Sequence, residues 1–280
     1  MIRAVLLFEL DGHSARDRGE FGSVAAAAGV TPAGAYTTLR TWNFRRRVLR
    51  FRDHLARLEE SAARLGSPQR LATGPVAAAL LAALRALPGH DEARVRLTLA
   101  PPRLYAAIEP FAPPSESARR QGVACVTVTE RRRDARCKDT RFADVARQVA
   151  ASLPEGVHEG LMLGDDGAIL EGLSSNFFAV RDGVLRTEDE RVLPGVTRAM
   201  VLELARERLP VELRPVAAGE LDRVTESFIT STSRGVLPVV RIETRPVGDG
   251  RPGPVTLDLM QALERRIVIE SEALEDLARV

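Results

Sequence analysis

The stretch that decides the fold of this chain is Ile169-Leu170-Glu171-Gly172-Leu173-Ser174-Ser175-Asn176-Phe177-Phe178. Its apolar residues predict two short strands joined by a turn of small residues. Glu171 follows directly after apolar strand residues, and the stretch holds no other charged side chain. A carboxylate in such surroundings is a candidate for partial burial, which is costly unless a cationic partner is present. The stretch therefore predicts a site at which Glu171 meets a positive charge.

Upstream of this stretch, Arg136-Cys137-Lys138-Asp139-Thr140 contains the only lysine of the chain. Apart from Lys138, the 40 lysines and arginines of the chain are all arginine, so arginine stands at almost every basic position. Arginine stays protonated, whereas a lysine can lose its proton and attack a carbonyl carbon. The alternative interpretation is that Lys138 is an exposed surface residue that is lysine by chance. The neighbouring motifs favour a position at which a primary amine is required.

Two further stretches are suited to bind an anion. Leu193-Pro194-Gly195-Val196-Thr197-Arg198 is a loop that runs into a predicted helix, whose first N–H groups lack acceptors within the helix. Thr230-Ser231-Thr232-Ser233 follows a predicted strand and is rich in hydroxyl groups. An amine, an anion site and a carboxylate that could pair with a protonated pyridine nitrogen together indicate an aldehyde cofactor that carries a phosphate.

These motifs resemble those of the fold-type IV pyridoxal-phosphate enzymes, which include branched-chain and D-amino-acid aminotransferases and aminodeoxychorismate lyase. The resemblance extends from about Gly34 to the C-terminal helix. Each motif is weak alone, but their order and separations match the family. The matching stretches are Gly34–Arg40, His54-Leu55-Ala56-Arg57-Leu58, Glu171–Phe178, Leu185-Arg186-Thr187 and Leu193–Arg198.

The resemblance implies a role for each matching residue. Lys138 would form the Schiff base with pyridoxal 5′-phosphate and then shuttle a proton, and Glu171 would hold the pyridine nitrogen protonated. The phosphate would be bound by Arg57, Val196, Thr197, Ser231 and Thr232. The expected substrate pocket comprises Tyr36, Thr38, Arg96, Arg103 and Ser233. Asn176 and His54 are expected to be structural, and no metal is expected.

Several positions depart from the family pattern and leave the substrate open. Thr37 stands where aminotransferases often carry a glutamate, and Phe142 and Ala143 stand where some members have a tyrosine. Arg96 and Arg103 are the alternatives for binding a substrate carboxylate. We expect an aminotransferase that moves an amino group between an amino acid and a 2-oxo acid. A lyase that releases pyruvate is the alternative, and a non-enzymatic anion-binding protein is a third.

The composition limits the remaining classes of function. The chain has 280 residues, 45% of them hydrophobic, and a net charge of +2. We expect no nucleic-acid partner, because the arginines are dispersed and the runs at 45–47 and 131–133 are typical of solvated turns or strand ends. Two cysteines do not form a disulfide framework, and we expect a cytoplasmic protein without a membrane span or signal peptide. The resemblance also implies a homodimer, with the site between two domains of each chain.

The predicted fold class is α/β (α+β). A smaller N-terminal α/β domain is expected at 1–113, a linker at 114–121 and a larger, strand-rich, cofactor-binding domain at 122–280. Asp53 is expected to cap a helix that ends at Gly66, and 23–29 could be a helix or a loop. Other predicted helices lie at 75–87, 142–153, 197–208 and 255–274. Predicted strands lie at 2–9, 35–42, 48–51, 94–99, 104–108, 122–129, 160–163, 168–170, 176–180, 184–186, 211–214, 226–231 and 236–242.

Overall fold

The computed structural model describes residues 4–89 and 91–280, and the chain divides into two compact units. The first unit comprises the described residues up to Ala112 together with Cys137–Asp144 and Ile267–Val280. The second comprises Pro113–Arg136 and Val145–Arg266. The sequence-based division at 113 and 122 stays a prediction. Within the segment expected as a linker, Glu116–Gln121 form a helix (α4), and Ser115 caps it by accepting a hydrogen bond from the N–H of Ala118.

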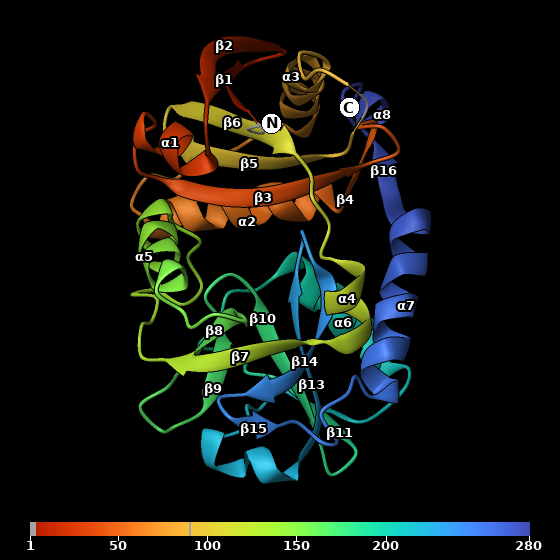
Figure 1. The fold of residues 1–280 in the computed structure, drawn as a ribbon. Coiled ribbons are helices and arrows are strands. Elements are labelled where there is room, and N and C mark those ends of the chain that lie inside the picture. Colours follow the sequence, from red (N-terminus) through yellow and green to blue (C-terminus); the bar gives the residue numbers. More distant parts are fainter. Residues whose placement is uncertain (1–3, 90) are drawn as a thin grey trace. The chain divides into compact units, whose positions relative to one another are not determined.

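The first unit is built on an antiparallel sheet whose strand order is β16-β4-β3-β5-β6-β1-β2 (Figure 1). Its central strands were predicted, whereas β2 was not, because its charged sequence lacks a hydrophobic face. The C-terminal strand β16, which pairs with β4, lies in a region predicted to be helical. The strands are β1 (Val5–Asp11), β2 (Ser14–Phe21), β3 (Ala35–Trp42), β4 (Arg47–Leu49), β5 (Ala93–Ala100), β6 (Arg103–Pro110) and β16 (Ser271–Ala273).

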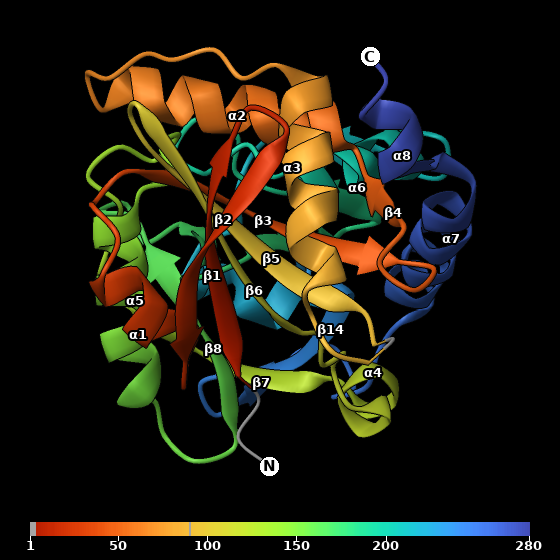
Figure 2. The ribbon, with the colours of Figure 1, turned by 90° about the horizontal axis from the view of Figure 1, so that it is seen from above.

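Helices cover both faces of this sheet. Helix α2 (Phe51–Arg64) packs beneath β3, and α3 (Thr73–Arg85) packs on β1 and β2, where Figure 2 shows it from above. The short helices α1 (Val24–Gly29) and α8 (Leu274–Leu277) complete the unit. Because side chains alternate along a strand, Phe8 and Leu10 enter the core beneath α2 and α3, whereas Val5 and Leu7 pack with α1. For the segment 23–29 the sequence left helix and loop as alternatives; the structure shows a helix, α1, with Ser23 as its cap.

The start of α2 differs from the prediction. The residue that precedes the helix is Arg50, which has a left-handed backbone and no capping side chain, so Asp53 lies in the first turn instead of at the cap. An acidic residue in that turn still interacts favourably with the helix dipole. At the other end, Gly66 adopts a φ of 79°, the conformation in which glycine commonly ends a helix. Leu65, the residue before this glycine, is exposed.

The second unit is a mixed sheet whose main order is β12-β11-β10-β13-β14-β7-β8-β9. Because β9 also pairs with β10, through Glu171 and Asn176, the strands from β10 round to β9 close on themselves. The strands are β7 (Val123–Val128), β8 (Val157–Leu163), β9 (Ile169–Gly172), β10 (Asn176–Arg181), β11 (Val184–Arg186), β12 (Val211–Glu212), β13 (Val224–Ser231), β14 (Gly235–Ile242) and β15 (Arg245–Pro246), which pairs with β14.

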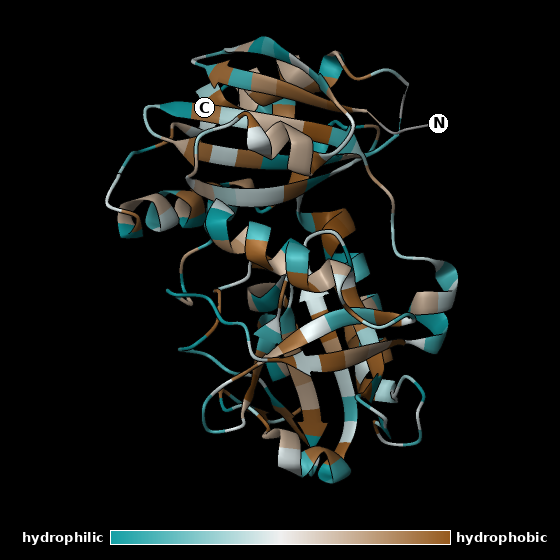
Figure 3. Ribbon diagram, turned by 60° about the vertical axis from the view of Figure 1, so that its left-hand side comes forward, coloured by the Kyte–Doolittle hydropathy of each residue, from teal (hydrophilic) through white to brown (hydrophobic). Residues whose placement is uncertain are grey.

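Alternating side chains of these strands fill two cores. Phe177 and Ile229 belong to the cluster enclosed by the closed strands, whereas Phe178 and Phe228 point to the other face and stack with ring centroids 4.9 Å apart. Helix α6 (Val196–Arg206) packs on β13. The helices α5 (Thr140–Ala151) and α7 (Pro254–Glu270) begin and end in different units. Figure 3 shows hydrophobic and hydrophilic residues alternating along several strands.

The fold class predicted from the sequence, mixed α and β with a strand-rich second half, is confirmed. Besides β2 and β16, the prediction missed β15 and the 3-10 helix η1 (Ala218–Arg223), which are too short to show a hydrophobic period. In the described ranges, 4–89 and 91–280, no helix is long and apolar enough to cross a membrane.

We expect Phe228→Ala to lower the free energy of unfolding by ~3–5 kcal/mol, because it removes a fully buried ring and leaves a cavity beneath Phe178. The control is Phe44→Ala, since Phe44 is 67% exposed and its truncation should change stability by less than ~0.5 kcal/mol. Urea unfolding followed by circular dichroism would measure both. Equal losses for the two variants would contradict this packing.

Candidate functional site

The segment that carries Lys138 is fixed in the first unit by three backbone contacts. The Lys138 carbonyl accepts a hydrogen bond from the N–H of Tyr36 at 2.8 Å, and the N–H of Lys138 donates to Ser61 Oγ at 3.1 Å. One residue further on, the N–H of Thr140 donates to the Gly34 carbonyl at 2.9 Å. The start of β3 and the end of α2 therefore hold the lysine's backbone from both sides.

The Lys138 side chain is half-buried and lies beside an aromatic ring. Its Nζ is 4.7 Å from the centroid of the Tyr36 ring, and the Arg96 guanidinium stacks on the same ring at 4.0 Å. Tyr36 and Thr38 alternate with the buried residues of β3, and Thr38 is directly opposite Arg96 on β5. Lys138, Tyr36, Thr38 and Arg96 are thus neighbours at one face of the sheet. Arg103, near the edge of the same face, is exposed and pairs with Glu9 at 3.7 Å.

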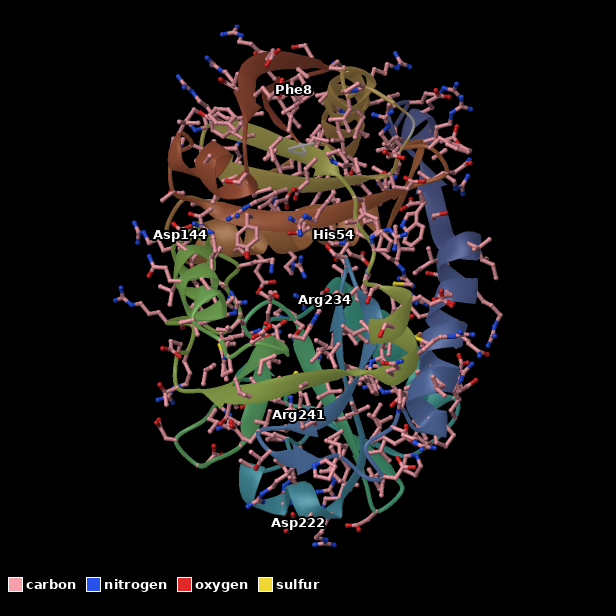
Figure 4. All side chains as sticks on the ribbon, in the orientation of Figure 1. Phe8, His54, Asp144, Asp222, Arg234 and Arg241 are labelled. Carbon is pink, nitrogen blue, oxygen red and sulfur yellow. The ribbon has the colours of Figure 1, made fainter. Side chains whose placement is uncertain are left out.

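Helix α2 presents a stripe of buried polar residues, His54, Arg57 and Ser61, at helical spacing on the face that packs on β3. Arg57 Nη2 donates to Thr37 Oγ1 at 2.8 Å, and the same oxygen is 2.8 Å from His54 Nδ1. Figure 4 shows His54 on α2, beside β3. The predicted phosphate ligand Arg57 is therefore held from inside the unit.

The His54 imidazole is 2% exposed. Burial lowers its pKa well below the usual value of 6.5, because the protonated ring would lose its hydration, and the nearby charges of Arg57 and Lys138 lower the pKa further. His54 is therefore neutral at physiological pH.

In the second unit, Glu171 is 2% exposed and lies where β9 and β10 close the sheet. Arg132 Nε donates to Glu171 Oε1 at 3.0 Å, and both side chains are almost fully buried. Asn176 Nδ2 and the N–H of Leu193 donate to Oε2 at 3.0 and 3.2 Å. The carboxylate therefore has a cationic partner in the chain itself, which the sequence analysis had not identified.

Arg132 corrects the interpretation of the run 131–133 as a solvated turn. Its neighbours Arg131 and Arg133 are exposed, and Arg131 pairs with Asp165 on the surface. Arg132 points inward because Glu171 needs a counterion. The run 45–47 also contains a buried member, since Arg45 Nη1 donates to the Leu87 carbonyl at 2.8 Å beyond the end of α3.

The N-terminus of α6 lies beside Asn176 and has no side-chain cap. Gly195 precedes the helix and has no side chain to cap it, so the first N–H groups, including those of Val196 and Thr197, remain available. A Cβ at Gly195 would collide with Asn176 Oδ1. Thr230, opposite Asn176 in the sheet, is 1% exposed, and its Oγ1 has no hydrogen-bond partner among the described residues. The structure thus leaves a buried hydroxyl and helix N–H groups of the same sheet end available to a ligand.

The hydroxyl-rich turn at the end of β13 is held by a partly buried ion pair. Arg234 Nη1 donates to Glu159 Oε2 at 2.6 Å, and its Nη2 donates to Ser174 Oγ at 2.7 Å. The N–H of Arg234 donates to Ser231 Oγ at 3.3 Å. These contacts fix the turn that carries Ser231, Thr232 and Ser233. The sequence analysis missed Glu159 and Arg234, for which neighbouring motifs gave no signal.

The described residues thus include the Lys138 amine beside an aromatic ring, a buried carboxylate with its counterion, and a helix N-terminus suited to an anion. An amine, a buried carboxylate and a helix N-terminus of this kind are typical of proteins that bind an anionic cofactor. The family model of class IV amino-transferases matches residues 34–242, which is more than half of the chain. The chain belongs to the amino-transferase class IV family.

Proteins with related sequences are named as aminotransferases. A protein of Aquifex aeolicus named a probable branched-chain-amino-acid aminotransferase is 34% identical over 124 residues, which are 43% of this chain. The D-alanine aminotransferase of Bacillus licheniformis is 38% identical over 109 residues, 38% of this chain. The chain matches 40% and 38% of these relatives' lengths, less than half of each.

Solved structures share the fold. The branched-chain amino acid aminotransferase of Escherichia coli superimposes with a TM-score of 0.77, and the match covers 97% of this chain and 99% of that one at 22% identity. A branched-chain amino acid aminotransferase solved with pyridoxamine 5′-phosphate superimposes with a TM-score of 0.78 over 98% of this chain and 100% of that one, also at 22% identity. At these identities the likeness shows the fold alone.

We expect Arg132→Met to lower the free energy of unfolding by ~3–5 kcal/mol, because Glu171 would be left as a buried charge without its counterion. Arg131→Met is the matched control, since the exposed pair with Asp165 should contribute less than ~1 kcal/mol. Urea unfolding at pH 7 would measure both variants. A loss below ~1 kcal/mol for Arg132→Met would contradict a buried ion pair.

We expect the stability of the protein to depend on pH through His54. The unfolded chain takes up a proton at this residue near pH 6.5, whereas the folded chain does not, so the free energy of unfolding falls as the pH drops below 6.5. One such group contributes a slope of up to ~1.4 kcal/mol per pH unit.

His54→Asn should remove this contribution, because asparagine does not titrate. His158, whose pKa is also lowered by burial, adds a slope of the same sign in both proteins, so the difference between them isolates His54. Thermal or urea unfolding between pH 5 and 8 would measure it. Parallel stability curves for wild type and variant would show that the folded His54 titrates normally.

Proposed function

We propose that the protein is a pyridoxal-phosphate-dependent aminotransferase that moves an amino group between an amino acid and a 2-oxo acid. The observation that carries this proposal is Lys138, the only lysine of a class IV amino-transferase chain. Its backbone is fixed by β3 and α2, and its half-buried side chain lies 4.7 Å from the Tyr36 ring.

The donor groups of the chain fit such a cofactor. Arg57, the first turn of α6 and the hydroxyl groups of Ser231 and Thr232 supply donors for a phosphate. The unpartnered Thr230 Oγ1 supports an anion at the same sheet end. Glu171, kept in place by Arg132, supplies a fixed negative charge for a protonated ring nitrogen. When bound, the cofactor contributes an aldehyde that accepts the amino group and a ring that stabilises negative charge at the substrate Cα.

The roles of the side chains follow from their chemistry. In our proposal the Lys138 amine would hold the cofactor and, when free, would take the proton from the substrate Cα and pass it to the carbon that carried the aldehyde oxygen. In the reverse half of the cycle it would move a proton back to Cα. Arg132, Asn176 and the N–H of Leu193 stabilise the ionised form of Glu171 by donating hydrogen bonds to it.

For the substrate, we propose a pocket that includes Tyr36, Thr38 and Ser233, with Arg96 as the ligand of the carboxylate. Arg96 is supported by its stacking on Tyr36 and by its position opposite Thr38. Arg103, the other sequence-based candidate, lies on the same face of the sheet but is exposed and pairs with Glu9. A planar guanidinium can bind a carboxylate through two parallel hydrogen bonds, which would fix the orientation of the amino acid.

Amino-group transfer is favoured over the alternatives. The relatives reported above are named aminotransferases, which supports transfer over elimination of pyruvate. Family membership removes the basis for a non-enzymatic anion-binding protein. We retain a homodimer and a cytoplasmic location as proposals. The exposed apolar residues Val268 and Ile269 fit an interface with a second copy, and the two buried free cysteines fit a reducing compartment.

The test is a panel of L- and D-amino acids assayed with 2-oxo acid acceptors. Wild type should bind pyridoxal phosphate with a visible absorbance band and turn over at least one pair in an acceptor-dependent manner. Lys138→Ala should abolish borohydride-trapped cofactor and lower turnover by at least ~100-fold, the scale of a lost general base. Arg46→Ala, at an exposed arginine outside the site, is the control.

Failure of wild type to bind pyridoxal phosphate would refute the proposal. Release of pyruvate from aminodeoxychorismate without an acceptor, in the absence of any transfer, would assign the lyase reaction instead. The enantiomer accepted in the panel would identify the stereochemical preference.

A further inference from the structure

A buried pair of polar residues, Thr37 and His54, lies behind Arg57 in the first unit. Thr37 is 0% exposed and His54 is 2% exposed, so neither can bind a substrate from solvent. The Thr37 hydroxyl links His54 to Arg57, because Thr37 Oγ1 lies 2.8 Å from Arg57 Nη2 and 2.8 Å from His54 Nδ1. A buried polar atom without a hydrogen-bond partner destabilises the fold, so we expect the Thr37 hydroxyl and His54 Nδ1 to be hydrogen-bonded.

The direction of the hydrogen bonds follows from the chemistry of the groups. A guanidinium only donates, so Thr37 Oγ1 is the acceptor from Arg57. The hydroxyl proton of Thr37 then needs an acceptor in a buried environment, and His54 Nδ1 is the atom within reach. A neutral imidazole that accepts at Nδ1 carries its proton on Nε2. The order of donation is therefore from Arg57 to Thr37 and from Thr37 to His54.

We infer that Thr37 and His54 are positioning residues that fix the Arg57 guanidinium for an anionic phosphate. This inference rests on the proposed function, in which Arg57 binds the cofactor phosphate. The side chain of an arginine has several rotatable bonds, and holding it costs conformational entropy. Thr37, on the rigid strand β3, and His54, one turn earlier on α2, fix one edge of the guanidinium before a ligand arrives.

The neutrality of both partners matters for this role. A carboxylate at Nη2 would hold the guanidinium equally well but would compete electrostatically with a phosphate. A hydroxyl and a neutral imidazole orient the donor without adding negative charge. Thr37 and His54 should therefore raise the affinity for a ligand that carries a phosphate and not the affinity for the same ring without one.

The experiment compares pyridoxal phosphate with pyridoxal, which lacks the phosphate. Thr37→Val keeps the shape of the side chain and removes the hydrogen bond, and His54→Leu removes the acceptor. Each should raise the dissociation constant for pyridoxal phosphate about tenfold, the scale of one hydrogen bond to a charged group, and change that for pyridoxal less than twofold. Equilibrium dialysis of the cofactor-depleted protein measures both constants.

Two variants serve as matched controls. Thr41→Val removes a buried threonine hydrogen bond on the same strand, where Thr41 Oγ1 donates to Glu92 Oε2 at 2.6 Å, and should leave both affinities within twofold of wild type. His54→Asn keeps an acceptor at the δ position and should restore most of the affinity lost in His54→Leu.

Nitrogen-15 NMR of the wild-type protein gives a second readout that needs no variant to fold. The His54 signal, assigned by its absence in His54→Asn, should show a protonated Nε2 and an unprotonated Nδ1. A proton on Nδ1 would overturn the inference. So would equal losses for Thr37→Val and Thr41→Val, or an equal loss of pyridoxal and pyridoxal phosphate. If wild type bound no pyridoxal phosphate, the proposed function would fall and this inference with it; tight wild-type binding with an unaltered Thr37→Val would overturn this inference alone.

Discussion

The buried negative charge of Glu171 is the constraint on which the second unit depends. Its donors come from segments far apart in sequence: Arg132 before α5, Asn176 at the start of β10 and the Leu193 amide before α6. Satisfying one carboxylate therefore fixes the closure of the sheet and the start of α6 together. Asn176 also donates to the Leu193 carbonyl at 2.9 Å, so a single amide side chain ties the carboxylate to the loop that leads into α6. Loss of any one donor would disturb both.

The first unit solves a similar problem with a helix instead of a sheet closure. The buried polar residues of α2 make two sets of contacts. Ser61 accepts a hydrogen bond from the backbone of Lys138, and Arg57 and His54 contact Thr37 on β3. A helix whose apolar face carried only leucine would pack as well but would leave the lysine segment and the guanidinium unsupported. Polar residues in this core therefore contribute orientation more than stability.

Much of this arrangement could be predicted from the sequence, and the gaps have physical causes. Glu171, Lys138 and the loop before α6 were recognisable because their local surroundings are unusual for their chemistry. Arg132 was not, because a residue in a run of arginines shows its orientation only through a partner 39 residues away. Strand β2 was missed because both of its faces are polar. The roles of Thr37 and His54 depend on the packing of α2 against β3, which no local pattern specifies.

The replacement of every lysine but one has a practical consequence for the biochemist. An endoprotease specific for lysine has one possible cleavage point, after Lys138, and would divide the chain into two fragments of almost equal length. Reagents selective for primary amines have only this side chain and the amino terminus as targets. Because Lys138 is half-buried and its backbone is held by β3 and α2, its labelling rate would report how readily this segment opens. The composition of the chain thus provides a single-residue probe of its proposed site without any substitution.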